Sequence, residues 1–288
     1  MSVLNALICP LDKHPLTLKD RSFVCLSGHS FDLAKSGYIN LLPVQNKRSK
    51  DPGDSKEMVA SRRDFLALDH YQPIAETITS YLLAQDVFNR DICLLDAGCG
   101  DGYYLNHIKQ NCTSNGKYLD VMGLDISKWA ITTASKSNKF IHWVVGSNAH
   151  IPTASECFDV VTCLFGFPIF SEFSRVLKPT GRLLMVDVGA DHLIELRRIL
   201  YPKIHDYEDG YSKGVEGFSL VEEQALTFPF LLSSQAHIQN LLSMTPHIHK
   251  APYEGKKALE QIESLELTAD VKLRWYIKNT EIIENNND

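Results

Sequence analysis

The stretch that decides the fold reads Leu94-Leu95-Asp96-Ala97-Gly98-Cys99-Gly100-Asp101-Gly102. It begins as an apolar run and ends in three glycines, which is the pattern of a buried strand that turns tightly into a helix. Glycines at such a turn allow positive φ and let a ligand approach the backbone closely. The stretch therefore predicts a ligand-binding turn at the end of the first strand of a parallel sheet.

The spacing and charge of this turn predict the class of ligand. A dinucleotide-binding turn would have its third glycine at the position of Tyr103. It would also hold a pyrophosphate, which the carboxylates of Asp96 and Asp101 would repel. S-adenosylmethionine (SAM) carries a sulfonium and an ammonium group and no phosphate, so it suits these carboxylates. The turn predicts SAM binding through a set of aspartates and glycines: Asp96, Gly98, Gly100, Asp101 and Gly102.

A further carboxylate supports the same ligand. Asp125 ends the next apolar run, where an acidic residue can accept both hydrogen bonds of a ribose diol. In the alternative interpretation, Asp96 and Asp125 only cap the turns that follow them. The combination of both residues with the glycine turn favours a cofactor site.

Short apolar runs alternate with helical patterns through the middle of the chain. The expected strands are Ile92–Ala97, Val121–Asp125, Ile141–Val145, Asp159–Phe165 and Leu183–Asp187. The expected helices between them are Tyr103–Gln110, Lys128–Lys136 and Ile169–Leu177. This alternation predicts an α/β fold with a doubly wound parallel sheet. The pattern weakens after Arg198, where Val271–Ile277 is a candidate closing strand and Met244-Thr245-Pro246 marks a turn.

We expect four parts along the chain. Residues 1–44 form a small module, residues 45–84 a basic linker and helix, residues 85–280 the main domain, and residues 281–288 a disordered acidic tail. The helical pattern runs from Lys56 to Leu83, with Pro73 marking a break or a helix start. The module is too small to hold a substantial core unaided.

The N-terminal module carries an altered metal-binding pattern. A zinc ribbon would read Cys-x2-Cys, a spacer and Cys-x3-His, and here Asp12 stands at the second position beside Cys9, Cys25 and His29. Three interpretations are open. Asp12 supplies the fourth zinc ligand, His14 supplies it instead, or the module folds without metal.

The charge distribution bears on the partner of the protein. The net charge is −6, yet residues 1–63 hold ten Lys/Arg against six Asp/Glu. The basic residues cluster at Lys47, Arg48, Lys50, Lys56, Arg62 and Arg63. Such a run is either a solvated linker and helix face or a surface that contacts nucleic acid phosphates.

The composition indicates a compartment. The seven cysteines are scattered, without the dense framework of a secreted scaffold. No apolar stretch reaches membrane-spanning length, and the first residues lack a secretory signal. We expect a cytoplasmic protein without membrane contacts.

Residues 92–190 resemble the class I superfamily of SAM-dependent methyltransferases, which have a Rossmann-like doubly wound sheet. In that superfamily a segment after the third strand contacts the adenine, and Gly146-Ser147-Asn148-Ala149 stands at that position here. The resemblance implies a cofactor contact from Asn148.

Motifs outside this sheet narrow the resemblance. They are Cys9-Pro10-Leu11, Cys25 with His29, Gly37–Pro43, Asp51–Ser55, Arg62–Leu66, His70–Pro73 and Asp187–Leu196. Together they resemble the RlmA family of 23S rRNA (guanine-N1)-methyltransferases, across nearly the whole chain. The resemblance implies a zinc-ribbon-like module, a homodimer and methylation of N1 of a guanine in the hairpin 35 loop of 23S rRNA. It also implies cofactor contacts from Tyr71, the Gly100–Gly102 turn and His192.

Guanine N1 carries a proton that must leave as the methyl group arrives. A carboxylate or an imidazole within hydrogen-bond reach can accept it, and Asp101, Asp187 and His192 are the candidates. Phe165 and Phe167 follow the fourth expected strand and are placed to hold a flipped base, unless Phe165 belongs to the core. Two other functions remain open, a small-molecule SAM-dependent methyltransferase and a non-catalytic RNA-binding protein that retains the fold.

Overall fold

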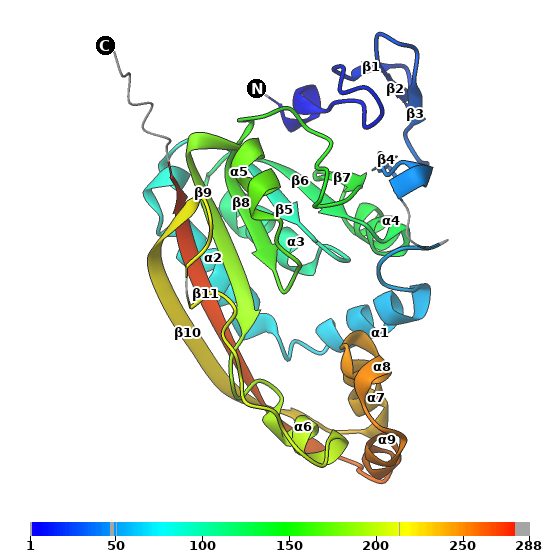
Figure 1. Ribbon diagram of the computed structural model, residues 1–288, viewed down its shortest axis with the longest axis vertical. Helices are drawn as coiled ribbons and strands as arrows, with labels where there is room; N and C mark the ends of the chain where they lie inside the picture. The colour runs from blue at the N-terminus through cyan, green and yellow to red at the C-terminus, as the bar shows by residue number, and fades with distance from the viewer. Residues whose placement is uncertain (1, 47–48, 50, 213, 280–288) are drawn as a thin grey trace, which may run out of the picture.

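The computed structural model describes residues 2–46, 49, 51–212 and 214–279. Its described part is organised around an eight-stranded sheet in the order β10-β11-β9-β8-β5-β6-β7-β4 (Figure 1). The strands are β4 (Ile39–Asn40), β5 (Ile92–Ala97), β6 (Leu119–Asp125), β7 (His142–Val145), β8 (Phe158–Leu164), β9 (Leu177–Val188), β10 (Phe218–Leu232) and β11 (Leu265–Lys278). Strands β4 to β9 run parallel, and β11 pairs antiparallel with both β9 and β10.

The five strands and three crossover helices expected in the middle of the chain are all present. The helices are α3 (Tyr103–Ser114), α4 (Lys128–Ser137) and α5 (Phe170–Val176). Apolar packing covers both faces of the sheet, since Leu94 belongs to one hydrophobic cluster and its neighbour Leu95 to another. The prediction of a doubly wound parallel sheet is confirmed, and the antiparallel pair β10 and β11 extends it.

The helical pattern of residues 56–83 divides into two helices. Helix α1 (Lys56–Leu66) is capped by Ser55, whose Oγ accepts a hydrogen bond from the Met58 amide at 3.2 Å. Helix α2 (Gln72–Leu83) has Pro73 in its first turn, where a missing amide hydrogen costs no hydrogen bond. Asp69 lies between them with φ +59°. Pro73 therefore marks a helix start, one of its two interpretations.

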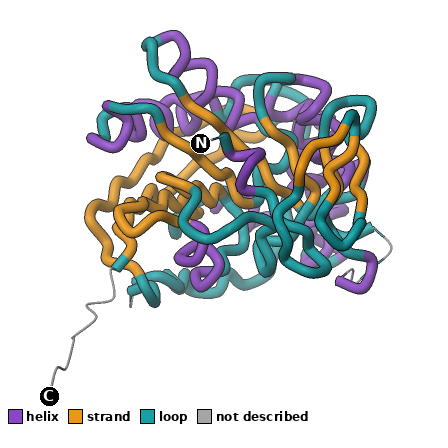
Figure 2. Tube along the Cα trace, turned by 90° about the horizontal axis from the view of Figure 1, so that it is seen from above, coloured by secondary structure: helices purple, strands orange, loops and turns teal. Residues whose placement is uncertain are grey.

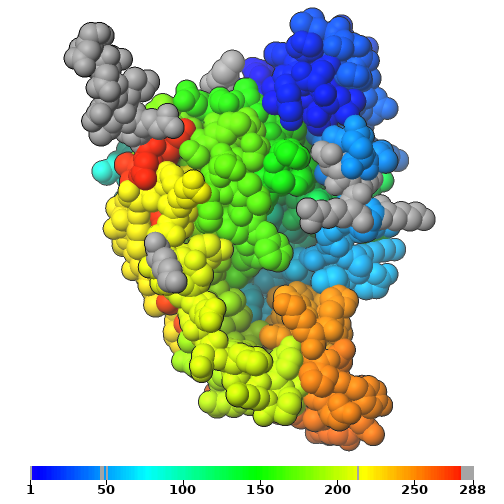
Figure 3. Space-filling view, in the orientation of Figure 1, coloured from blue at the N-terminus to red at the C-terminus, as the bar shows by residue number. Residues whose placement is uncertain are grey.

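The N-terminal module consists of a small antiparallel sheet that stands at one end of the molecule, in blue in Figure 3. Its strands are β1 (Thr17–Lys19), β2 (Ser22–Val24) and β3 (Ser30–Asp32), preceded by the 3-10 helix η1 (Val3–Ala6). The short strand β4 leaves the module and pairs with β7, so that Ile39 lies opposite Val144. The module is thereby joined to the edge of the large sheet.

The region after Arg198 holds more structure than the sequence pattern indicates. Helix α6 (Ile194–Leu200) precedes β10, and α7 (Gln235–Met244), α8 (His247–Lys250) and α9 (Tyr253–Leu259) follow it. Helix α7 packs on α1 at the lower right of Figure 1, and Figure 2 shows the layers from above. The expected strand Val271–Ile277 is part of β11, and the expected turn at Thr245 separates α7 from α8.

No helix among the described residues is both long and apolar enough to cross a lipid bilayer. The basic residues Lys47, Arg48 and Lys50 and the tail from residue 280 lie outside the described part of the chain.

Candidate active site and metal centre

The glycine turn leads from β5 into α3 with a left-handed backbone. Gly98, Gly100 and Gly102 have φ values of +91°, +57° and +83°. The Gly98 and Cys99 amides both donate to the carbonyl of Leu124, at 2.8 and 3.0 Å, which ties the turn to β6. These three glycines are required because the turn needs positive φ.

Gly102 has a second reason to be glycine. A Cβ atom at this position would lie 2.5 Å from the indole ring of Trp143. By contrast, a Cβ atom at Gly100 would have Arg62 as its nearest neighbour, at 3.8 Å. Gly102 therefore packs against the protein interior, whereas Gly100 borders a more open space beside Arg62.

The carboxylate of Asp125 holds this turn in shape. One oxygen, Oδ2, accepts from the Gly100 amide at 2.9 Å, and Oδ1 accepts from the Ser127 amide at 2.7 Å. The capping role that the sequence left open is therefore real. Each carboxylate oxygen keeps a further lone pair, so the same group can also accept from a ribose diol.

Three carboxylates around the turn favour a cationic ligand: Asp96 is buried, and Asp101 and Asp125 are half-buried. Burial raises the pKa of Asp96 to about 7, and the like charge of Asp125 adds to the rise, whereas the Thr162 hydroxyl, which donates to Asp96 at 2.8 Å, opposes it. Burial also raises the pKa of Asp101 and of Asp125. Since burial disfavours the ionised form of each, a positive ligand between them would be stabilised strongly.

One cation, Arg62, lies beside this acidic turn. Its charge opposes the rise in the pKa of Asp101. Its guanidinium pairs with the carboxylate of Asp54 and donates to the carbonyl of Met244 at 3.4 Å. The Asp54 carbonyl in turn accepts from the Ser127 hydroxyl at 2.7 Å. Arg62 thus joins α1, α7 and the segment before α1 around the cofactor turn, and the sequence indicated no such role for it.

Tyr71 and His192, far apart in the sequence, meet in the structure. The Tyr71 hydroxyl lies 3.2 Å from His192 Nε2, and His192 Nδ1 accepts from the Asp270 amide at 3.2 Å. Since Nδ1 is the acceptor, the proton of the neutral ring is on Nε2, which donates to Tyr71. Burial lowers the pKa of His192 to about 4, so the ring is neutral at physiological pH. His192 therefore acts as a donor and has no free lone pair for a substrate proton.

The loop after β8 presents aromatic groups next to the turn. The Phe165 side chain is 37% exposed, so it does not belong to the core, and Phe167 is 89% exposed. Phe165 adopts φ +56°, a conformation that costs a non-glycine residue free energy, and its amide donates to Val186 at 2.8 Å. The Tyr104 ring lies 5.8 Å from the Phe165 ring. Asn148 Nδ2 donates to the Phe167 carbonyl at 3.2 Å, which ties this loop to the segment after β7.

Asp187 lies at the end of β9 in a cluster of charged and phenolic groups. Burial raises its pKa to about 6, while Arg274 on β11, with NH1 3.7 Å from Asp187 Oδ2, lowers it. Arg274 is 2% exposed and also pairs with Asp209 and with Glu223, the latter at 2.6 Å. Three buried atoms of this cluster have no hydrogen-bond partner within the described chain: Asp187 Oδ2, Arg274 NH1 and the Tyr276 hydroxyl.

The four candidate zinc ligands converge in the N-terminal module. The Sγ atoms of Cys9 and Cys25, His29 Nδ1 and Asp12 Oδ2 all lie within 4.8 Å of one another. The closest pairs are 3.0 to 3.5 Å apart. Tetrahedral zinc ligands at 2.0–2.3 Å from the ion would be about 3.3–3.8 Å apart, so the four atoms fit a zinc ion. His14 contacts Asp12 and Ser27 at the edge and does not join the group.

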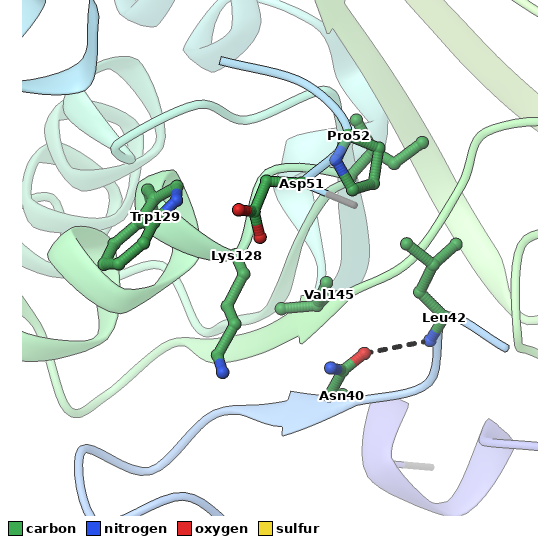
Figure 4. Close-up of a pocket in the computed structure, with 8 residues that line it drawn as sticks. Asn40, Leu42, Asp51, Pro52, Lys128, Trp129 and Val145 are labelled. Carbon is green, nitrogen blue, oxygen red and sulfur yellow. Dashed lines mark hydrogen bonds between the residues drawn. The ribbon is translucent and has the colours of Figure 1, made fainter. Parts of the chain in front are cut away.

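A small hollow of about 20 Å³ lies between the segment after β4, the segment before α1 and the start of α4 (Figure 4). Its lining includes Asn40, the last residue of β4, and Leu42 just after that strand. Pro52, and the Trp129 ring at the start of α4, line it as well. The Leu42 amide donates to Asn40 Oδ1 at 3.1 Å. The segment before α1 therefore packs over the end of β6 and closes one side of the site.

The structure brings most of the predicted residues together and adds others. The turn, Asp125 and Asn148 border one region, and Tyr104 connects it to Phe165. Tyr104 and Arg274 are additions, because an isolated tyrosine or arginine gives no spacing pattern in a sequence. Only their contacts with predicted residues reveal them. Arg62, which the sequence places in the basic cluster, gains a position beside the cofactor turn.

Two family descriptions match the chain. The description "RlmA, N-terminal" matches residues 7–50, and "Methyltransferase domain" matches residues 95–185. The first contains all four candidate zinc ligands, and the second contains the glycine turn and Asp125. The prediction of a class I methyltransferase fold with an N-terminal zinc ribbon is confirmed, and the chain is a SAM-dependent methyltransferase.

Curated relatives extend the similarity over most of the chain. A Bacillus subtilis protein named "Putative 23S rRNA (guanine-N(1)-)-methyltransferase YxjB" is 32% identical over 275 residues, which is 92% of this chain and 94% of that protein. A Streptomyces fradiae "23S rRNA (guanine(748)-N(1))-methyltransferase" is 30% identical over 213 residues, or 73% of each chain. These similarities, together with the zinc ribbon and the glycine turn, show that the chain belongs to the RlmA family of 23S rRNA (guanine-N1)-methyltransferases.

Proposed function

We propose that this protein transfers a methyl group from SAM to N1 of a guanine in the hairpin 35 loop of 23S rRNA. The observation that carries the proposal is the zinc-ribbon module joined to a methyltransferase sheet, in a chain that is similar over most of its length to proteins named 23S rRNA (guanine-N(1))-methyltransferases. A hairpin loop suits such an enzyme, because its unstacked bases can be reached, whereas the deep groove of A-form RNA excludes side chains.

The cofactor contacts of this proposal come from the middle of the chain, between residues 71 and 192. They are Tyr71, Asp96, Gly98, Gly100, Asp101, Gly102, Asp125, Asn148 and His192. Asp125 accepts from the ribose, and the carboxylates around the turn favour the positive groups of SAM. We add Arg62, whose guanidinium beside Gly100 and Asp101 can pair with the carboxylate of the methionine moiety.

We propose that Asp187 accepts the proton that guanine N1 loses. His192 has its one ring proton on Nε2 and its other nitrogen already bonded. Asp101 accepts from the Tyr103 amide at 3.4 Å within the cofactor turn itself. Asp187 has a pKa near 6 and lies at the end of β9, whose Val186 holds the Phe165 loop. A carboxylate with that pKa is largely ionised at pH 7 and can accept a proton.

The chemical step then needs few groups. Bound SAM supplies an electrophilic methyl group on a sulfonium. The Phe165 loop holds the guanine, Asp187 accepts the N1 proton as the nitrogen–carbon bond forms, and the sulfur keeps the electron pair of the bond that breaks. Alignment of the reacting atoms contributes much of the acceleration.

The metal centre of the proposal is a zinc ion held by Cys9, Asp12, Cys25 and His29. The convergence of these four ligand atoms supports it. A closed four-ligand site would stabilise the short strands β1 to β3, which bury few side chains of their own. The resemblance to the family adds a homodimer, which sedimentation of the purified protein tests. The scattered cysteines support a cytoplasmic location.

Transfer of tritium from labelled SAM into 23S rRNA tests the function. The rRNA comes from a strain that lacks the enzyme, so its target position is unmodified. Incorporation close to one methyl group per 23S molecule is expected. Absence of incorporation with intact SAM binding would favour a small-molecule substrate, and failure to bind millimolar SAM would favour a non-catalytic RNA-binding protein.

A further inference from the structure

A hollow lined by lysines lies where the N-terminal module meets α4. Its volume is about 460 Å³, and it opens widely to solvent. One wall is the segment of residues 34–38, which follows β3. The other wall is the second half of α4 together with Lys139, which lies two residues after the helix ends. Lys35 comes from the first wall, and Lys136 and Lys139 come from the second, about a hundred positions later in the chain.

The two walls are fixed to one another by hydrogen bonds. The Ser135 hydroxyl donates to the Ser36 hydroxyl at 2.8 Å, and Lys139 Nζ donates to the Ser36 carbonyl at 2.6 Å. Lys139 also donates to the carbonyl of Ser135. The two backbone segments that carry the lysines are therefore held together before any ligand arrives, which lowers the entropic cost of binding one.

The charge of this surface is of one sign. Residues 33–46 and 127–140 contain Lys35, Lys128, Lys136 and Lys139 and no Asp or Glu. Among the ion pairs of the described residues, none involves these four lysines. An unpaired cationic surface on a protein of net charge −6 attracts an anionic partner locally.

Several features favour a polynucleotide over a small anion. The hollow is open, so it suits a chain that passes along it more than an enclosed ion. Phe140, next to Lys139, is 83% exposed and offers a ring on which a base can stack. Helix α4 begins at Lys128, three residues after the proposed ribose contact Asp125, and Lys136 lies about 12 Å further along its axis.

We propose that Lys35, Lys136 and Lys139 bind backbone phosphates of the rRNA substrate. The proposal rests on the rRNA methyltransferase function and adds the surface that holds the RNA outside the reacting hairpin loop. The guanine lies at the ends of β8 and β9, and the adjoining RNA runs along α4 to the zinc module. The junction between the two parts thus serves as a phosphate-binding site.

The double variant Lys35→Gln/Lys136→Gln tests the proposal, and Lys139 is kept because it holds the junction. A matched control, Lys117→Gln/Lys257→Gln, removes two exposed or half-exposed lysines elsewhere. The measurement is the Kd for 23S rRNA from a strain lacking the enzyme, across a series of salt concentrations. The K35Q/K136Q variant should bind at least tenfold more weakly in 0.1 M salt, with the slope of log K against log salt smaller by about 1.4–1.8.

Zinc content, Tm and the Kd for SAM should match the wild type, which separates lost RNA contacts from misfolding. Suppose that the wild-type enzyme methylates rRNA, but the K35Q/K136Q variant binds RNA within twofold of the wild type and with an unchanged salt slope. That result would overturn the phosphate-binding site and leave the proposed function standing. A wild-type protein that neither bound nor methylated rRNA would overturn the proposed function, and this surface with it.

Discussion

At the residue scale, Asp187 is the group on which the proposed chemistry depends most. Burial raises its pKa to about 6, and the positive charge of Arg274 limits that rise. A proton acceptor must be ionised, so kcat should fall about tenfold per pH unit below pH 6 and level off above it. Asp187→Asn should lower kcat by about 10²–10⁴-fold and leave the Kd for SAM unchanged.

Single-turnover rates from pH 5 to 9 measure this dependence. Asp191→Asn, which changes an exposed carboxylate four residues further on, is the control and should retain the wild-type profile. Near-normal turnover by Asp187→Asn would remove Asp187 from the chemical step.

Arg62 gives a second prediction, this one on cofactor affinity. If its guanidinium pairs with the carboxylate of SAM, Arg62→Met should weaken SAM binding by roughly 10–100-fold, the range of a charge-assisted hydrogen bond. Binding of 5′-methylthioadenosine, which lacks the amino-acid portion, should change less than twofold.

Calorimetric titration of both ligands separates the two effects. Arg63→Met is the matched control on the same helix, since Arg63 pairs with Asp64 at the surface and its side chain is 60% exposed. Equal losses for SAM and methylthioadenosine would show that Arg62 supports the fold of the site and does not contact the carboxylate.

At the element scale, we predict that the zinc module depends on its metal. Strands β1 to β3 have three residues each, too few to form a stable sheet without further support. Purified protein should hold close to one zinc per chain. Chelation should increase amide exchange across residues 7–33 while β5 and β6 stay protected.

Asp12 accounts for how firmly the ion is held. Asp12→Cys would restore a sulfur ligand and should slow zinc loss to a chelator, because closed structural sites are built from Cys and His. Less than about a tenth of an equivalent of zinc after metal-replete expression would instead show that the module folds without metal.

The elements also show which parts of the fold a sequence reveals. Strands β5, β6 and β8 are buried on both faces, so they stand out as continuous apolar runs. Strand β10 lies at the sheet edge and is exposed along most of its length, with Glu222, Glu223 and Pro229 inside it. Its apolar alternation is confined to Leu226, Phe228, Phe230 and Leu232. Pro229 interrupts this alternation and argues against a strand, so the sequence did not predict β10.

The same limit applies to the site. The turn and its aspartates could be predicted because chemistry fixes their spacing within one loop. The Tyr71–His192 pair and the Asp187–Arg274 pair join residues 121 and 87 positions apart, and only the folded sheet brings each pair together. The resemblance to the family indicated Tyr71 and His192, but Arg274 had no signal in the sequence.

At the scale of the whole molecule, the zinc module and the methyltransferase sheet form one connected surface. Strand β4 joins the large sheet, and the Val3 amide donates to Asp120 at 2.8 Å. The lysine-lined hollow lies at this junction beside the C-terminal half of α4, and Asp125, the proposed ribose contact, precedes the N-terminal end of the same helix. Such an arrangement suits a large anionic substrate that contacts both parts.

Mass spectrometry of rRNA fragments after reaction in vitro tests the central claim most directly. The substrate is 23S rRNA from a strain lacking the enzyme, incubated with SAM and the purified protein. The account predicts one added methyl group, on N1 of a single guanine within the hairpin 35 loop. Methylation of another atom or another region of the rRNA, or an unmodified rRNA beside a protein that binds SAM, would contradict it.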